Sequence, residues 1–325
     1  MELPKLEDLK VSGRKVLVRA DLDVGDSVED LERLKNLVPT LEYLVGKAER
    51  IIVIGHRGRP QGKVVENLSL RPVSRRLEQF LKKKWGEERV KRLSLYLMEN
   101  LRFNPGEEAN NEDYAKQLAK EGEVYVNEAF AASHRKHASI VALPRLLPHA
   151  AGLHFMEEVE NLSRVFEKPE RPILVIIGGA KKDKLALIED LKKLADKILV
   201  GGRLPEEIPE ANDEKLIVAT LLPDKEEITI HSMERFEEEI KKAKTIVLSG
   251  PMGKFEEKGH RQGTERVFRA VADASAFKVA GGGETQKAVL MFGLEKKFDW
   301  RSVAGGAMLE FLAKRTLPGI EALLH

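Results

Sequence analysis

Short aliphatic runs alternate with amphipathic segments from one end of this 325-residue chain to the other. Runs such as 51–54 and 173–177 lack the apolar–polar alternation of a half-exposed strand, so we expect them to be buried on both faces. Strands of this kind, separated by helices, are typical of parallel sheets. The predicted strands cover residues 15–20, 50–55, 93–98, 123–127, 173–177, 197–200, 216–219, 245–248 and 277–280.

Helical patterns occupy most of the connections between these strands. They are predicted over residues 30–45, 70–84, 112–120, 183–195, 234–242 and 263–274. Prolines mark a boundary near the middle, because Pro144 and Pro148 precede a helical pattern over 149–166 and Pro169 and Pro172 follow it. We therefore predict an α/β fold with one parallel-sheet domain, a connecting helix and a second parallel-sheet domain.

Composition excludes several classes of function. The 55 basic residues nearly balance 53 acidic ones, and a net charge of +2 is no signature of a nucleic-acid-binding protein. The absence of cysteine excludes disulfides, thiolate nucleophiles and cysteine–zinc sites. No apolar run approaches the ~18 residues that a membrane helix needs, and residues 1–5 do not begin a signal peptide, so cytoplasm is the expected location. Abundant Glu, Lys and Arg point to a thermophilic source.

Cationic side chains follow the predicted strands of the first half. His56 and Arg59 follow the second strand, Arg102 the third and Arg135 the fourth, while Arg33 lies just beyond the first. A single arginine is usually a solvated surface residue. Parallel strands, however, end at one edge of their sheet, and guanidinium groups suit phosphate and carboxylate. Four successive strands with this pattern predict a site for a multiply anionic small molecule.

Two other interpretations of these basic residues are weaker. His134 and His137 have a spacing that occurs in metal sites, but their neighbours are cationic and no third ligand is near, which favours an anion over zinc. Arg57, Arg59 and the charged run 71–92 leave RNA binding open. Aromatic stacking residues are scarce there, so the run is better explained as the solvated face of a helix.

Glycines follow the predicted strands of the second half. Each pair on its own is explained by a tight turn. Together they would bring backbone N–H groups and helix N-termini to one ligand, which suits nucleotide phosphates. The chain has neither a Walker A motif nor a G-x-G-x-x-G motif, so it predicts neither an ordinary P-loop nor an ordinary dinucleotide fold.

Eight short motifs occur in an order that resembles phosphoglycerate kinase along the whole chain. The motifs are 16–23 (VLVRADLD), 55–60 (GHRGRP), 99–103 (ENLRF), 127–135 (NEAFAASHR), 178–181 (GGAK), 250–253 (GPMG), 281–285 (GGGET) and 305–307 (GGA). The resemblance implies two Rossmann-like domains with a cleft between them. It also implies a glycolytic kinase that interconverts 1,3-bisphosphoglycerate plus MgADP with 3-phosphoglycerate plus MgATP, or that catalyses a closely related acyl-phosphate reaction, the carboxyl group being the acceptor.

The resemblance also implies domain boundaries. A phosphoglycerate-binding domain would cover residues 1–148, and a connecting helix that acts as a hinge for closure would cover 149–170. A nucleotide-type domain would cover 171–304, and residues 305–325 would return toward the first domain.

Site residues can be carried over one by one. The resemblance implies catalytic roles for Arg33, Lys181, Gly305 and Gly306, and a metal-binding role for Glu284 toward the Mg²⁺ that accompanies ATP or ADP. The residues implied for the phosphorylated acid are Asp21, Asp23, Arg33, His56, Arg59, Arg102 and Arg135. Those implied for the nucleotide are Lys181, Lys184, Gly201, Gly202, Pro251, Gly253, Glu256, Gly281, Gly282, Gly283, Glu284 and Thr285.

The chain departs from the family pattern chiefly on the nucleotide side. Only 46 residues separate Gly202 from Ser249, which is far fewer than in the family and removes much of the adenine and ribose pocket. One residue is missing before Lys184, which turns later helical side chains by ~100°. Asp23 replaces an asparagine, Ser249 an asparagine, and Glu284 an aspartate or histidine. The alternative function is a noncatalytic relative that binds a phosphorylated metabolite or a partner protein.

Overall fold

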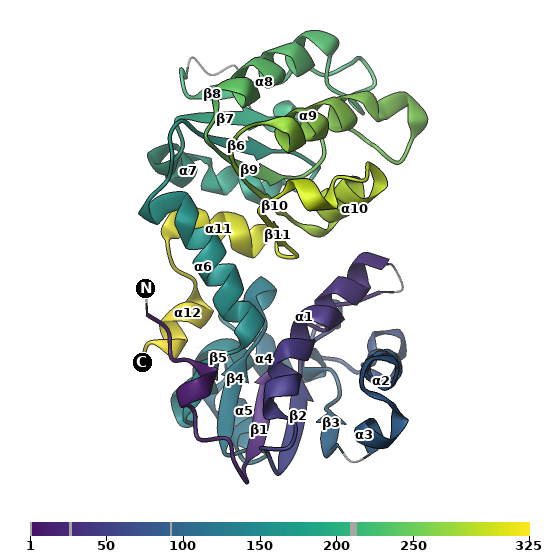
Figure 1. Cartoon of the computed structure of the whole chain (residues 1–325), viewed down its shortest axis with the longest axis vertical. Coiled ribbons are helices and arrows are strands. Elements are labelled where there is room, and N and C mark those ends of the chain that lie inside the picture. The colour runs from purple at the N-terminus through teal and green to yellow at the C-terminus, as the bar shows by residue number, and fades with distance from the viewer. Residues whose placement is uncertain (1, 26–27, 92, 209–212) are drawn as a thin grey trace. The chain divides into compact units, whose positions relative to one another are not determined.

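A computed structural model describes the chain except for residues 1, 26–27, 92 and 209–212 (Figure 1). The chain divides into two compact units, one made of Met1–Val159 with Leu317–His325 and the other of Glu160–Thr316. Among the described residues, no helix combines the length and the apolar character needed to cross a membrane.

The first unit contains a parallel sheet with the strand order β3-β2-β1-β4-β5. Within it, Arg19 pairs with Ile54 on one side and with Asn127 on the other, so the central strands end at the same level. The loops that follow these strands are therefore neighbours. The strands are β1 (Lys15–Arg19), β2 (Arg50–Ile54), β3 (Leu95–Leu97), β4 (Val124–Asn127) and β5 (His149–Ala151).

Helix α1 (Val28–Leu44) packs along β1 and β2 (Figure 1). Its residues Leu34, Leu37, Leu41 and Leu44 recur at helical spacing and are at most 2% exposed. Each leucine buried in this way contributes roughly 1.5–3 kcal/mol. The other helices of this unit are α2 (Arg71–Trp85), α3 (Glu87–Lys91), α4 (Pro105–Glu108), α5 (Glu112–Ala119), α12 (Pro318–Leu323) and the first part of α6 (Leu153–Glu167).

The second unit contains a parallel sheet with the order β11-β10-β9-β6-β7-β8. Every residue of the central strand β6 is buried, as its unbroken aliphatic sequence predicts. The strands are β6 (Ile173–Ile177), β7 (Lys197–Val200), β8 (Leu216–Val218), β9 (Thr245–Ser249), β10 (Phe277–Gly281) and β11 (Trp300–Ser302). The helices are α7 (Ile188–Leu194), α8 (Ile230–Lys242), α9 (Gln262–Asp273), α10 (Gly283–Met291) and α11 (Gly306–Lys314).

The structure corrects two of the predicted helices and adds two strands, β5 and β11. The helical pattern over 149–166 contains strand β5, and α6 begins only at Leu153. Strand β11 was not predicted. Both missed strands have three residues and lie at sheet edges, where burial imposes little pattern on the sequence. The predicted helix over 183–195 begins as a 3₁₀ segment at Lys182–Leu187. The final segment divides at Thr316, with α11 in the second unit and α12 in the first.

Side chains of the first unit fix the start of α6. The Leu153 N–H donates to Thr40 Oγ1 at 2.8 Å, and the His154 N–H donates to Glu128 Oε1 at 2.9 Å. Glu128 lies so close to Gly152 that a Cβ there would meet Oε2 at 1.4 Å, so a larger residue would displace the Glu128 carboxyl group. Helix α6 therefore begins where Thr40 and Glu128 accept its first N–H groups.

Glu128 predicts a pH-dependent stability. Burial raises the pKa of this carboxyl from 4.5 to about 7, so the folded state binds its proton more tightly than the unfolded state. The free energy of unfolding should then fall by about 3 kcal/mol as the pH rises from 4.5 to 7. Glu128→Gln should flatten this fall in denaturant titrations across the pH range. Exposed Glu121 is a matched control, and an unchanged slope in Glu128→Gln would contradict the assignment.

Candidate active site

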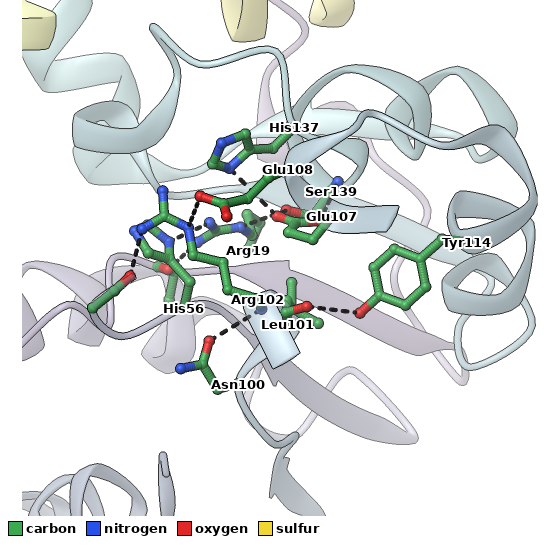
Figure 2. Close-up of polar contacts among 12 residues, drawn as sticks. Arg19, His56, Asn100, Leu101, Arg102, Glu107, Glu108, Tyr114, His137 and Ser139 are labelled. Carbon is green, nitrogen blue, oxygen red and sulfur yellow. Dashed lines mark hydrogen bonds and ion pairs between the residues drawn. The ribbon is translucent and has the colours of Figure 1, made fainter. Parts of the chain in front are cut away.

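The loops that follow the strands of the first unit bring a group of basic side chains together (Figure 2). His56 follows β2, Arg102 lies in the short helix Leu101–Phe103 after β3, and Arg135 and His137 follow β4. The positive charges of Arg102 and Arg135 act on both histidines, which shows that these loops converge. The predicted cluster of His56, Arg102 and Arg135 is therefore formed in the structure.

Arg102 is a buried cation with incomplete pairing. It is 1% exposed, and its Nη1 donates to the Gly58 carbonyl at 2.6 Å. Its Nε lies 3.3 Å from Glu108 Oε1, but neither Nε nor Nη2 makes a hydrogen bond among the described residues. Burial and the charge of Arg135 lower the pKa of Arg102 to about 10. Such a guanidinium gains stability from a bound anion.

The local sequence holds Arg102 in this position. Asn100 caps the short helix, because its Oδ1 accepts the Arg102 N–H at 3.1 Å. The Nδ2 group of Asn100 donates to the carbonyls of Arg57 at 2.7 Å and Leu68 at 2.9 Å. One buried asparagine thus ties the loop after β3 to the loop after β2.

Both buried histidines of this cluster are neutral. Burial and the charge of Arg19 hold the pKa of His56 well below its usual range. Burial and the charge of Arg102 lower the pKa of His137 to about 3. Among the described residues, no three His, Asp or Glu side chains are arranged to hold a metal ion. The cluster has the character of an anion site, with neutral donors beside fixed cations.

The two aspartates of the first motif have different partners. Arg33 Nη1 lies 3.1 Å from Asp21 Oδ2 and donates to the Asp23 carbonyl at 3.2 Å. The Asp23 side chain accepts the Gly58 N–H at 2.8 Å, where Gly58 has a φ of +61°. Asp23 therefore joins the loop after β1 to the loop after β2. Arg59 is exposed and makes no polar contact within the described parts of the chain.

The glycines of the second unit allow its strand-end loops to pack closely. A Cβ on Gly178 would lie 2.2 Å from the Pro251 carbonyl oxygen, and one on Gly202 would lie 2.4 Å from the Gly179 nitrogen. The N–H group of Gly179 donates to the Pro251 carbonyl at 2.7 Å, and that of Gly202 to the Met252 carbonyl at 3.1 Å. These amides therefore bond to other loops of the protein.

Other amides stay available at helix N-termini. Gly283 begins α10, and Gly305 and Gly306 begin α11. Their N–H groups have no acceptor within the part of the chain that the structure describes, and a Cβ at Gly283 or Gly306 would meet nothing within 4 Å. Gly282 and Gly305 bring the two helix starts together, because a Cβ on Gly305 would lie 3.0 Å from the Gly282 Cα. These amides are the backbone donors of this unit that remain open to an anion.

Two lysines follow β6 and differ in their surroundings. Lys184 Nζ donates to the carbonyls of Gly178 at 2.9 Å and Ser249 at 3.0 Å, which links the ends of β6 and β9. Burial lowers the pKa of Lys184 to about 8, although Glu284 opposes this shift. Lys181 is exposed, and its ammonium has no partner among the described residues. Lys181 is thus the lysine that can reach a ligand without breaking protein contacts.

The remaining residues predicted for the nucleotide make contacts within the protein. Thr285 Oγ1 donates to the Gly281 carbonyl and accepts the Gly250 N–H, both at 2.8 Å, so it joins the loops after β9 and β10. Gly253 instead packs against Glu227, and the Glu256 carbonyl accepts a bond from Arg261 near the start of α9. Gly201 packs on Met252.

Arg19 is the site residue that the sequence analysis missed. It is fully buried at the end of β1 and contacts His56, Ser139 and the Ala20 carbonyl. A charged residue that closes an unbroken apolar run is the signal that could have identified it, because burial of such a charge requires partners.

Comparisons with known proteins agree on one family. The family model described as phosphoglycerate kinase matches residues 6–229 and 205–315. The phosphoglycerate kinase of Pelotomaculum thermopropionicum is 34% identical over 386 residues, covering 98% of each chain. That of Rubrobacter xylanophilus is 35% identical over 386 residues, covering 99% of this chain and 98% of the relative. Each alignment is 61 residues longer than this chain, so at least that many positions have no counterpart here.

Solved structures give the same result. The phosphoglycerate kinase from Pyrococcus horikoshii superposes with a TM-score of 0.82 at 26% identity, covering 99% of this chain and 98% of that one. The enzyme from Coxiella burnetii superposes with a TM-score of 0.79 at 28% identity, covering 99% of both chains. The similarity extends over both units. This chain belongs to the phosphoglycerate kinase family.

Proposed function

We propose that this protein transfers a phosphoryl group between the carboxyl group of 3-phosphoglycerate and ADP, in both directions. Family membership over nearly the whole chain supports a kinase with a carboxyl acceptor. The observation that carries the proposal is Arg102, a buried guanidinium whose Nε and Nη2 make no hydrogen bond with described residues. A phosphorylated acid supplies the anion that this arrangement lacks.

The acid would bind at the strand ends of the first unit. Arg102 and Arg135 would hold its phosphate group, and exposed Arg59 would close over it. Neutral His56 would add an N–H donor without adding charge. Asp21 and Asp23 would accept hydrogen bonds from the hydroxyl group of the acid. This division of roles uses cations for the doubly charged end and carboxylates for the neutral hydroxyl.

The transferring phosphoryl group requires further donors. Its transition state spreads negative charge over three equatorial oxygens, so positioned cations and amides perform most of the catalysis. Arg33 would leave Asp21 to contact these oxygens. Lys181 and the amides of Gly305 and Gly306 would stabilise the same charge from the nucleotide side.

The residues of the second unit fit a nucleotide that brings its own magnesium. Glu284 is the acidic residue in the first turn of α10, close to Lys184. Mg²⁺ in proteins is usually held by one or two carboxylates together with phosphate oxygens and waters. One carboxylate therefore suits Mg²⁺ that arrives with ATP or ADP. When bound, this ion would neutralise phosphate charge.

The shortened nucleotide side predicts weak selectivity for the base. In the described part of the segment between Gly202 and Ser249, α8 is the α-helix that connects β8 to β9. The two family matches overlap at residues 205–229, within the same segment. We propose that phosphate contacts dominate nucleotide binding here, so that GDP replaces ADP with little loss.

A coupled assay tests the proposal. Purified protein should form ATP from 1,3-bisphosphoglycerate and MgADP, and the rate should depend on both. The noncatalytic alternative, a protein that binds a phosphorylated metabolite or a partner protein, is not favoured by the comparisons. It would become the better account if no nucleotide supported turnover while 3-phosphoglycerate still raised the thermal midpoint. The proposal fails altogether if the acid neither turns over nor stabilises the fold.

A further inference from the structure

Arg19 makes three directed hydrogen bonds from a fully buried position at the end of β1 (Figure 2). Its Nε donates to Ser139 Oγ at 2.8 Å, its Nη1 to the Ala20 carbonyl, and its Nη2 to His56 Nδ1 at 2.8 Å. A guanidinium group has fixed geometry and can only donate. The side chain therefore sets both the place and the hydrogen-bonding role of each partner.

This contact defines the protonation of His56. Because Arg19 only donates, His56 Nδ1 must accept, and the proton of the neutral ring must lie on Nε2. Nε2 makes no hydrogen bond within the described residues. The cations around the ring come from every neighbouring loop, Arg19 from β1, Arg102 from the loop after β3 and Arg135 from the loop after β4, with His137 beside them. Another positive charge on the ring is therefore disfavoured.

A second set of contacts compensates the buried charge of Arg19. Ser139 Oγ accepts from Arg19 and donates to Glu107 Oε1 at 2.6 Å, while the Ser139 N–H donates to Glu107 Oε2 at 3.0 Å. Glu107 is fully buried, so its carboxylate is the counter-charge to Arg19 through the serine hydroxyl. A chain of hydrogen bonds therefore runs from Glu107 through Ser139 and Arg19 to His56. It ends at the Nε2–H group of His56, which makes no hydrogen bond with described residues.

We propose that Arg19 is a positioning residue that holds His56 as a neutral Nε2–H donor toward the phosphorylated acid. The identity of that ligand rests on the proposed function. The physical advantage is a hydrogen-bond donor whose protonation does not change with pH. His56 then offers one N–H across the physiological pH range, and substrate affinity does not vary with protonation of the ring. A lysine at position 19 could not reproduce this, because its donors sit on one nitrogen and lack the rigid planar fork that fixes all three partners.

Nitrogen NMR of histidine-labelled, full-length protein reads the tautomer directly, without substrate or turnover. His56→Gln assigns the signal. We expect His56 to carry its proton on Nε2 and to stay neutral well below the usual pKa of histidine. A proton on Nδ1, or a doubly protonated ring at neutral pH, would overturn the proposal. This measurement is informative even when a variant fails to fold, because it uses the unmodified protein.

The double variant Arg19→Met with Glu107→Gln removes both buried charges together, which keeps the charge balance. We expect its His56 to exchange between tautomers and to titrate. The ratio of variant to unmodified KM for 3-phosphoglycerate should then change by about tenfold between about pH 5.5 and 8, with a smaller change in kcat. Because both proteins meet the same substrate, this KM ratio is unaffected by the protonation of 3-phosphoglycerate itself.

Arg145→Ala is the matched control, because Arg145 is exposed in the same unit and its side chain makes no hydrogen bond or ion pair with described residues. A double variant that keeps the single tautomer and a constant KM ratio would contradict the role of Arg19. If the unmodified protein shows the expected tautomer but no turnover, the proposed function fails while the positioning of His56 stands.

Discussion

Arg33→Ala is expected to lower kcat for ATP formation by about a hundredfold or more, while KM for ADP changes little. Arg33 lies within 3.2 Å of Asp21 and of the Asp23 carbonyl in the ligand-free protein, so it is placed beside the proposed acid site. Its charge matters most when the phosphoryl oxygens carry their dispersed negative charge. Loss of one such donor typically costs about two to three orders of magnitude in rate.

Three further variants separate chemistry from folding. Arg33→Lys keeps the charge but loses the planar pair of donors, so we expect it to recover only part of the rate. Arg33→Ala alone leaves the Asp21 carboxylate without its cationic partner. The double variant Arg33→Ala with Asp21→Asn removes that unpaired carboxylate as well. Arg145→Ala should have full activity. Steady-state kinetics with circular dichroism as a folding check measure all four. A normal kcat in Arg33→Ala would exclude the catalytic role.

Arg102→Met should stabilise the ligand-free protein and abolish most acid binding. Two nitrogens of this buried guanidinium lack hydrogen bonds, and each such group costs about 1–3 kcal/mol. Replacement by an apolar side chain of similar length removes that cost. Glu108 loses its ion pair with Arg102, but it is exposed enough for water to hydrate its carboxylate. We expect the free energy of unfolding to rise by about 1 kcal/mol. Affinity for 3-phosphoglycerate should fall by about a hundredfold, because the buried cation is lost.

Thermal unfolding with and without ligand measures both effects in one experiment. The unmodified protein should be stabilised as 3-phosphoglycerate is added, whereas Arg102→Met should start higher and respond weakly. Arg145→Ala should respond as the unmodified protein does. A variant that is less stable without ligand but equally responsive to it would show that Arg102 serves the fold and not the site.

The strands could be predicted closely because burial on both faces leaves a strong signal. Strands β6 and β7 match their predicted ranges, and β1, β2 and β4 differ by one residue at one end. Strands β5 and β11 escaped detection because His149–Ala151 and Trp300–Ser302 carry no extended aliphatic run. The start of α6 depends on Thr40 and Glu128, which are distant in sequence, so local pattern placed it too early.

The site could be predicted in part. His56, Arg102 and Arg135 follow strands that share an edge, so position in the sheet is enough to bring them together. The role of Arg19 depends on Ser139, which is 120 residues away, and no local signal connects the two. The glycine motifs predict free amides at the strand ends. Several of those amides bond to neighbouring loops, because the absence of a Cβ serves close packing as well as ligand access.

The position of α12 has a consequence for the order in which the chain folds during synthesis. Leu317, Ile320 and Leu323 are at most 1% exposed, and the Gly319 N–H donates to the Ser133 carbonyl at 2.9 Å. The first unit therefore cannot complete its core until residues 317–325 have been translated. The second unit is continuous in sequence and has no such requirement. The half of the chain made first is thus the half that reaches its final packing last.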